Sequence, residues 1–161
     1  MDLAFDPNAL PFDADAMLTG LRPWVECESP TFDAAAVERM LDLAGRDLVI
    51  AGARIERIPG RMGFGDCVRA RLPHPMGDAP GILLMSHLDT VHPVGTGGDA
   101  GPLKFRRDGD RAFGPGICDM KGGAHIGNAA LAAIQRAGGA TKLPVTILLT
   151  PDEEVGTPSA R

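Results

Sequence analysis

The sequence contains no tyrosine and few other aromatic residues, with one tryptophan and six phenylalanines among 161 residues. A chain of this length can bury a core of its own, and that core must then be built mainly from aliphatic side chains. Basic residues do not outnumber acidic ones, since the formal net charge is −5 at pH 7. The chain therefore lacks the positive charge typical of nucleic-acid binding, and we expect no nucleic-acid partner.

Signals for disulfides and membranes are also missing. The three cysteines, Cys27, Cys67 and Cys118, are odd in number, widely spaced and never in a CxxC pair. This pattern argues against a disulfide framework and favours a reducing compartment. The amino terminus lacks a positive segment followed by a long apolar one, and no apolar run approaches membrane-spanning length. We therefore predict a cytoplasmic protein with no membrane partner.

Hydrophobic periodicity predicts an α/β fold. Apolar residues spaced three and four apart indicate helices, whereas short apolar or alternating runs bounded by glycine or proline indicate strands. The helices are predicted at 13–27, 33–51 and 120–137, the strands at 54–58, 66–72, 81–86 and 145–149, and a hairpin at 104–113. This order favours a three-layer αβα sandwich with a mixed central sheet. The apolar runs 81–86 and 145–149 are typical of strands buried on both faces.

The first group that can carry chemistry is His87-Leu-Asp89, directly after the apolar run 81–86. Proteins of the α/β class place ligand sites beyond the carboxyl ends of their strands, and residues i and i+2 of an extended segment point to the same side. Asp89 can therefore orient a metal-bound imidazole of His87. On its own, such a pair is more often a histidine that is hydrogen-bonded within a loop.

The second group is the glycine-rich stretch 114–123, which contains Asp119 near the expected start of a helix. Glycine at this density lets the backbone approach a site closely. Two other interpretations compete, since Asp119 could be an ordinary helix N-cap and the loop could cradle a phosphate. The glycine spacing fits neither of the common nucleotide-binding patterns, so we discount the phosphate interpretation.

The third group is Asp152-Glu153-Glu154, which follows the apolar run 145–149. Three consecutive carboxylates repel one another unless a cation or hydrogen bonds compensate, and a solvated loop is the alternative.

One metal site explains all three groups together, and histidine with carboxylates suits zinc, cobalt or manganese. Adjacent side chains point in different directions, so one glutamate can hold a metal while the other faces the substrate water. The spacing does not say which glutamate does which.

Three blocks of the sequence resemble, in order and spacing, the motifs of the M20 family of zinc-dependent metallopeptidases. The blocks are Ser86-His-Leu-Asp-Thr-Val91, Arg111-Ala-Phe-Gly-Pro-Gly-Ile-Cys-Asp-Met-Lys-Gly-Gly123 and Thr150-Pro-Asp-Glu-Glu-Val-Gly156. The resemblance spans residues 80–161 and is closest to the glutamate carboxypeptidase-like and acetylornithine deacetylase-like members. It implies the fold of a zinc-dependent exopeptidase.

The resemblance also implies a role for each site residue. His87 would bind one of two zinc ions, and Glu154 would bind the other. Asp119 would bridge both ions, and Asp89 would orient His87. Glu153 would be the general base that takes a proton from the metal-bridging water. The peptide bond after the bridging aspartate is usually cis in the family, so we expect a cis bond between Asp119 and Met120.

The implied reaction is hydrolysis of the amide bond of an N-acyl amino acid or small peptide with two Zn²⁺ ions, for which Co²⁺ or Mn²⁺ could substitute. Family members are longer, so residues 1–161 would be the amino-terminal portion of a single catalytic domain. The carboxy-terminal part of that domain and the lid or dimerisation domain would be absent. Each metal would keep two of three protein ligands, and the sheet would have an exposed apolar edge.

We therefore expect the chain alone to be poorly active and the full-length form to be a homodimer. Two alternatives stay open. The chain could be a non-catalytic truncated paralogue that binds metal weakly or pairs with a partner, or it could belong to a related two-zinc aminopeptidase family. The remaining histidines, His74, His92 and His125, match no ligand position and are interpreted as structural.

Overall fold

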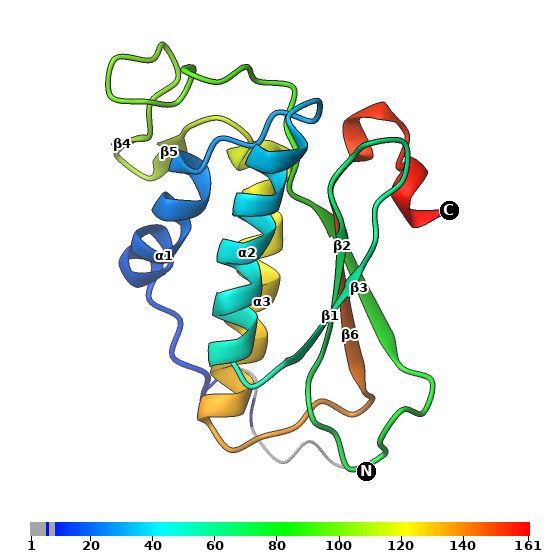
Figure 1. Cartoon of the computed structure of the whole chain (residues 1–161). Helices are drawn as coiled ribbons and strands as arrows, with labels where there is room; N and C mark the ends of the chain where they lie inside the picture. Colours follow the sequence, from blue (N-terminus) through cyan, green and yellow to red (C-terminus); the bar gives the residue numbers. More distant parts are fainter. Residues whose placement is uncertain (1–5, 7–8) are drawn as a thin grey trace.

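The computed structural model describes Asp6 and residues 9–161 (Figure 1). We predicted above that the amino terminus has no signal segment, and most of those first residues lie outside the described ones. The helices are α1 (Ala14–Glu26), α2 (Ala34–Ile50) and α3 (Gly122–Arg136). The strands are β1 (Arg54–Ile58), β2 (Cys67–Arg71), β3 (Ile82–His87), β4 (Arg106–Asp108), β5 (Arg111–Phe113) and β6 (Val145–Thr150). Every predicted element is therefore present, with its ends within about two residues of the prediction.

Four strands form one sheet in the order β1-β2-β6-β3. β2 runs antiparallel to β1 and to β6, whereas β3 runs parallel to β6. The prediction of an α/β fold with a mixed sheet is therefore confirmed. The parallel pair brings the carboxyl ends of β3 and β6 to the same edge, with His87 opposite Thr150. β4 and β5 pair separately as the expected hairpin.

All three helices lie on one side of the four-stranded sheet, so the described residues form the sheet and one helical layer (Figure 1). The core between them is aliphatic, as the composition requires, with Trp24 as its aromatic exception. The indole Nε1 of Trp24 donates a hydrogen bond of 2.7 Å to Asp47 Oδ2, so the ring is buried without losing its polar partner. The larger aliphatic members of this core are Leu21, Val25, Val37, Met40, Leu41, Leu48, Val68, Leu88, Leu131, Val145, Ile147 and Leu149.

The helix ends follow from local sequence. Asp13 and Asp33 accept backbone N–H groups at the starts of α1 and α2, as N-cap carboxylates do. Gly52 and Gly138 follow the last turns of α2 and α3 with φ angles of 90° and 67°. Glycine adopts this left-handed conformation without a steric penalty, and it therefore ends both helices at the predicted places.

β3 differs from the prediction of a strand buried on both faces. Ile82, Leu83, Leu84 and Met85 are between 36% and 55% exposed. Within the described part of the chain, β3 pairs with β6 alone and is the edge of the sheet. The apolar run therefore marks an uncovered edge, which the resemblance implies for a shortened sheet. β6 has neighbours on both sides and is buried or half-buried along its whole length.

Two other expectations concern cysteines and membranes. Cys27, Cys67 and Cys118 are all free, in agreement with the absence of a disulfide framework. In the described part of the chain, none of the helices combines the length and the apolar character that crossing a membrane requires.

Two neighbouring residues of α2 test the position of the core. Leu48 is 1% exposed, whereas Val49 is 55% exposed. We expect Leu48→Ala to lower the free energy of unfolding by about 2–5 kcal/mol because it leaves a cavity. Val49→Ala should change it by less than about 0.5 kcal/mol. Urea unfolding followed by circular dichroism measures both, and equal losses would contradict the assigned helix face.

Candidate metal centre

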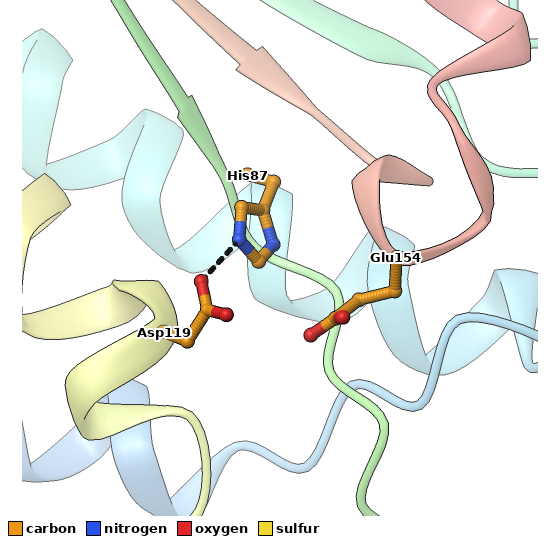
Figure 2. Close-up of side chains that lie close together, drawn as sticks. All are labelled: His87, Asp119 and Glu154. Atoms are coloured by element: carbon orange, nitrogen blue, oxygen red, sulfur yellow. Dashed lines mark hydrogen bonds and ion pairs between the residues drawn. The ribbon is translucent and has the colours of Figure 1, made fainter.

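His87 is the last residue of β3 and is 3% exposed. β3 and β6 run in parallel, and the backbone N–H of Leu88 donates to the carbonyl of Thr150 at 3.1 Å. The histidine therefore lies beside the end of β6, at the edge where sheets of this class bind ligands. Its Nε2 atom points toward Asp119 (Figure 2).

Asp119 lies in a tight turn, Ile117–Lys121, which precedes α3. Asp119 and Met120 have non-helical backbone angles, and the peptide bond between them is cis, as the resemblance implies. Asp119 does not cap α3, because the residue at the cap position is Lys121 and no side chain bonds the cap. The N-cap interpretation is therefore wrong. The Asp119 side chain is 72% exposed, and its Oδ1 accepts a hydrogen bond of 2.8 Å from His87 Nε2.

The three acids after β6 point to different places. Asp152 is fully buried, and its Oδ2 accepts a 2.8 Å hydrogen bond from the backbone of Ser159. Glu153 and Glu154 begin a short 3₁₀ turn, Glu153–Val155. Glu153 Oε2 lies 3.8 Å from His87 Nε2, and Glu154 faces the same imidazole (Figure 2). The predicted repulsion is thus relieved in part by turning one carboxylate into the interior and directing two toward the histidine.

Asp89 connects these parts. Its carboxylate is fully buried, and Oδ1 lies 3.3 Å from His87 Nδ1. Oδ1 also accepts the backbone N–H of Glu153 at 3.1 Å, and Oδ2 accepts that of Glu154 at 3.3 Å. The hydroxyl of Thr31 donates to Oδ2 at 2.8 Å. One side chain therefore orients the histidine and holds the backbone of both glutamates.

Thr31 belongs to a segment in which the sequence showed no motif. Ser29 Oγ donates to the Leu88 carbonyl at 2.6 Å, and the backbone of Thr90 donates to the Ser29 carbonyl at 2.8 Å. Residues 29–31 thus lie along residues 88–90 and support them. The sequence offered only the small polar residues around Pro30, which indicate a turn but not its partner.

The electrostatics of the site follow from crowding of carboxylates around one buried ring. Burial lowers the pKa of His87, but hydrogen bonds to Asp89 and Asp119 outweigh this effect and raise the pKa to about 9. The ring therefore carries both protons at neutral pH. Burial raises the pKa of Asp89, but hydrogen bonds from His87 and Thr31 and from two backbone N–H groups outweigh it, so the pKa is lowered.

Two further groups near the site have shifted pKa values. Partial burial raises the pKa of Glu154, and neighbouring carboxylates add to this rise against the opposing effect of His87. Burial lowers the pKa of Lys121 to about 8, so its amine remains protonated at neutral pH. Lys121 is 1% exposed and is not a metal-facing side chain, because its Nζ donates to the carbonyls of Trp24 and Cys27.

A cavity of about 190 Å³ adjoins the site and is bounded by Asp119, Glu154 and the loop that carries His92. His92 therefore lies beside the candidate centre, although the sequence gave it only a structural role. His74 and His125 lie elsewhere: His74 Nε2 is 2.9 Å from the Thr141 carbonyl, and His125 packs edge-on against Trp24 at 5.2 Å. Of these three histidines, His92 alone lines the cavity beside the site.

The donor set suits a metal ion. His87, Asp119 and Glu154 each offer one ligand atom, and these atoms lie within 4.8 Å of one another. Donors at this separation can belong to one metal centre, whether it holds one ion or two. Nδ1 of His87 donates to the Asp89 backbone carbonyl at 3.1 Å and lies 3.3 Å from the Asp89 carboxylate. Such partners at Nδ1, with Nε2 facing other carboxylates, are the usual arrangement of a zinc-binding histidine.

Comparison with known proteins gives a consistent result. The family model described as Peptidase family M20/M25/M40 matches residues 83–161. Carboxypeptidase G2 of Pseudomonas sp. (strain RS-16) is 31% identical over 147 residues, which cover 91% of this chain and 34% of that protein. Succinyl-diaminopimelate desuccinylase of Gluconobacter oxydans (strain 621H) is 33% identical over 134 residues, which cover 83% of this chain and 33% of that protein.

A solved structure shares the fold. Human carnosine dipeptidase 1 superimposes with a TM-score of 0.74 at 21% identity, over 90% of this chain and 33% of that one. In each comparison, the chain spans about a third of the length of the protein that it matches.

The raised pKa of His87 predicts how metal binding depends on pH. An ion must displace the proton on Nε2, so below the pKa of about 9 the affinity for Zn²⁺ should rise roughly tenfold per pH unit. Competition with a chelating dye between about pH 6.5 and 8 measures this slope. His74→Gln should leave the slope unchanged, and an affinity independent of pH would contradict the assignment.

The same proton also stabilises the folded chain when no ion is bound. Its contribution to the free energy of unfolding is complete below about pH 6.5 and is lost as pH rises through 9.

Asp89→Asn tests the connecting carboxylate. The amide keeps the shape but loses the charge, so we expect zinc affinity to fall about 10–100-fold and the pKa of His87 to fall. Zinc titration and NMR titration of the imidazole measure the two effects. Asp78→Asn alters another carboxylate that accepts a side-chain hydrogen bond, from Arg71, in the loop before β3, and should change neither. Equal effects of the two substitutions would refute the role of Asp89.

Proposed function

Because residues 83–161 belong to peptidase family M20/M25/M40, we propose that this chain is the amino-terminal portion of the catalytic domain of a metal-dependent hydrolase. The proposed reaction is cleavage of the amide bond of N-acyl amino acids or small peptides. The names of its relatives, a carboxypeptidase and a desuccinylase, support hydrolysis of an amide next to a carboxylate-bearing group. Each relative is matched over only about a third of its length, so the proposal names a class of substrate and not one compound.

The observation that carries the proposal is the convergence of three metal-capable atoms at the carboxyl ends of β3 and β6 (Figure 2). In the proposed site, His87 would hold one ion, Glu154 would hold the other, and Asp119 would be a ligand of both. Two Zn²⁺ ions suit these ligands, with Co²⁺ or Mn²⁺ as substitutes. When bound, such ions lower the pKa of a water and polarise a carbonyl oxygen.

Glu153 is the proposed general base. Its carboxylate lies 3.8 Å from His87 Nε2 and is 53% exposed, so it is near the site and open to substrate. It would take a proton from the attacking water and later deliver that proton to the leaving amine. Asp89 would keep His87 in the orientation that leaves Nε2 toward the cavity. The cavity beside Asp119 and Glu154 would receive the scissile group.

The number of ligands limits what these residues can do alone. In the described part of the chain, one group of three donors is found, whereas two zinc ions each need three or four protein ligands. We therefore propose that the 161 residues alone hydrolyse amides poorly, and that further ligands and a lid or dimerisation domain belong to a longer enzyme. The same shortage of ligands favours the second candidate, a non-catalytic chain that binds metal weakly. A homodimeric full-length form and a cytoplasmic location stay predictions.

The two glutamates provide the sharpest test, performed on the protein as its source produces it, once its intact mass is known. Glu153→Gln should lower kcat about 10²–10⁴-fold while the metal content stays unchanged, because only a proton acceptor is lost. Glu154→Gln should lower metal content together with activity. N-acyl amino acids and dipeptides with a free amino terminus are the substrates to compare.

The outcomes separate the candidates. Loss of metal in Glu153→Gln with retention in Glu154→Gln would mean that Glu153 is the metal ligand and Glu154 the general base. An intact mass equal to that of the 161 residues, together with no turnover and weak metal binding, would favour the non-catalytic alternative. Preference for free amino termini would favour an aminopeptidase.

A further inference from the structure

Lys121 is a buried charge without a carboxylate partner. Its side chain is 1% exposed, and none of the ion pairs among the described residues includes it. The ammonium Nζ instead donates to the carbonyl of Trp24 at 3.0 Å and to that of Cys27 at 2.8 Å. Both acceptors are at the end of α1, more than ninety residues earlier in the chain.

These two hydrogen bonds satisfy groups that would otherwise be costly to bury. The last carbonyls of a helix have no partner within the helix, and the helix end carries partial negative charge. An ammonium buried without a partner is equally unfavourable. The end of α1 and the side chain of Lys121 therefore stabilise each other, and this explains why a lysine can be buried at this position.

The position of Lys121 connects this contact to the candidate site. Asp119 lies two residues earlier in the same turn, and the backbone N–H of Lys121 closes that turn by donating to the Gly116 carbonyl at 2.8 Å. A Cβ atom at Gly116 would lie 3.4 Å from the Lys121 side chain, so the turn packs closely on the lysine stem. Asp119 itself is 72% exposed and has little packing of its own to hold it.

The other end of the contact leads to Asp89. Residues 29–31 begin three residues after the end of α1, and Thr31 donates to Asp89 Oδ2 at 2.8 Å. Lys121 therefore joins the turn that carries Asp119 to the segment that supports Asp89 and His87. Both sides of the candidate metal centre are fixed relative to the same helix end.

We propose that Lys121 is a positioning residue, whose buried ammonium fixes Asp119 relative to His87 by fastening the turn 117–121 to the end of α1. It contacts no substrate or ion, and it acts through the placement of Asp119. The proposal rests on the metal centre described above.

Cobalt binding to the protein as its source produces it tests this role without requiring turnover. Co²⁺ is titrated and followed by its visible absorption, which reports affinity and coordination geometry together. Lys121→Met keeps the length of the stem and removes the donors, and we expect affinity to fall roughly tenfold or more with a changed spectrum. Lys142→Met removes an exposed lysine and should match the wild type. Lys121→Arg keeps a cation with N–H donors and should recover part of the affinity.

Each outcome bears on a different claim. A folded Lys121→Met with wild-type affinity and spectrum would overturn the positioning role while leaving the metal centre intact. Absence of Co²⁺ binding by the wild-type protein as its source produces it would instead refute the metal centre itself. If Lys121 has a purely structural role, Lys121→Met should lower the free energy of unfolding and leave the Co²⁺ spectrum of the folded fraction unchanged. If Lys121→Met does not fold, Lys121→Gln and Lys121→Arg undergo the same comparison, and wild-type binding by both would overturn the proposal.

Discussion

The carboxylate of Asp89 is the interaction on which the candidate site depends. It is fully buried, and burying a charge is unfavourable unless hydrogen bonds and an opposite charge compensate. Here they come from the His87 ring, the Thr31 hydroxyl and the backbone of Glu153 and Glu154. Those partners belong to three segments that are distant in sequence. Because the carboxylate needs all of them, its burial brings together His87 and Glu154, two of the three candidate metal ligands.

Much of the fold and part of the site could be predicted from the sequence. Local signals were sufficient for the helices, since an aspartate begins α1 and α2 and a glycine ends α2 and α3. His87, Asp119 and Glu154 could be proposed as one group because two of them follow apolar strands and the third follows a glycine-rich loop. The structure brings the three close together.

The remaining features depend on contacts that are remote in sequence. Thr31 reads as a turn residue, and only the pairing of residues 29–31 with 88–90 places its hydroxyl on Asp89. No local pattern shows that Lys121 is buried, because its acceptors are at the end of α1. The apolar run of β3 predicts burial, but burial depends on which neighbours a strand has. A sequence pattern records what a side chain prefers, and the tertiary structure decides what it meets.

The order of strands in the sheet has a consequence for how the chain acquires its structure. β6 is the last strand in the sequence, yet it lies between β2 and β3. While the chain is being synthesised, β2 and β3 have no strand to join them until residues 145–150 have left the ribosome. The apolar side chains of β3 must remain unpaired for the synthesis of about sixty further residues, and such exposure favours aggregation. The strand that joins β2 to β3 is followed by Glu153 and Glu154, so this pairing and the candidate metal-binding edge should form in the same late step.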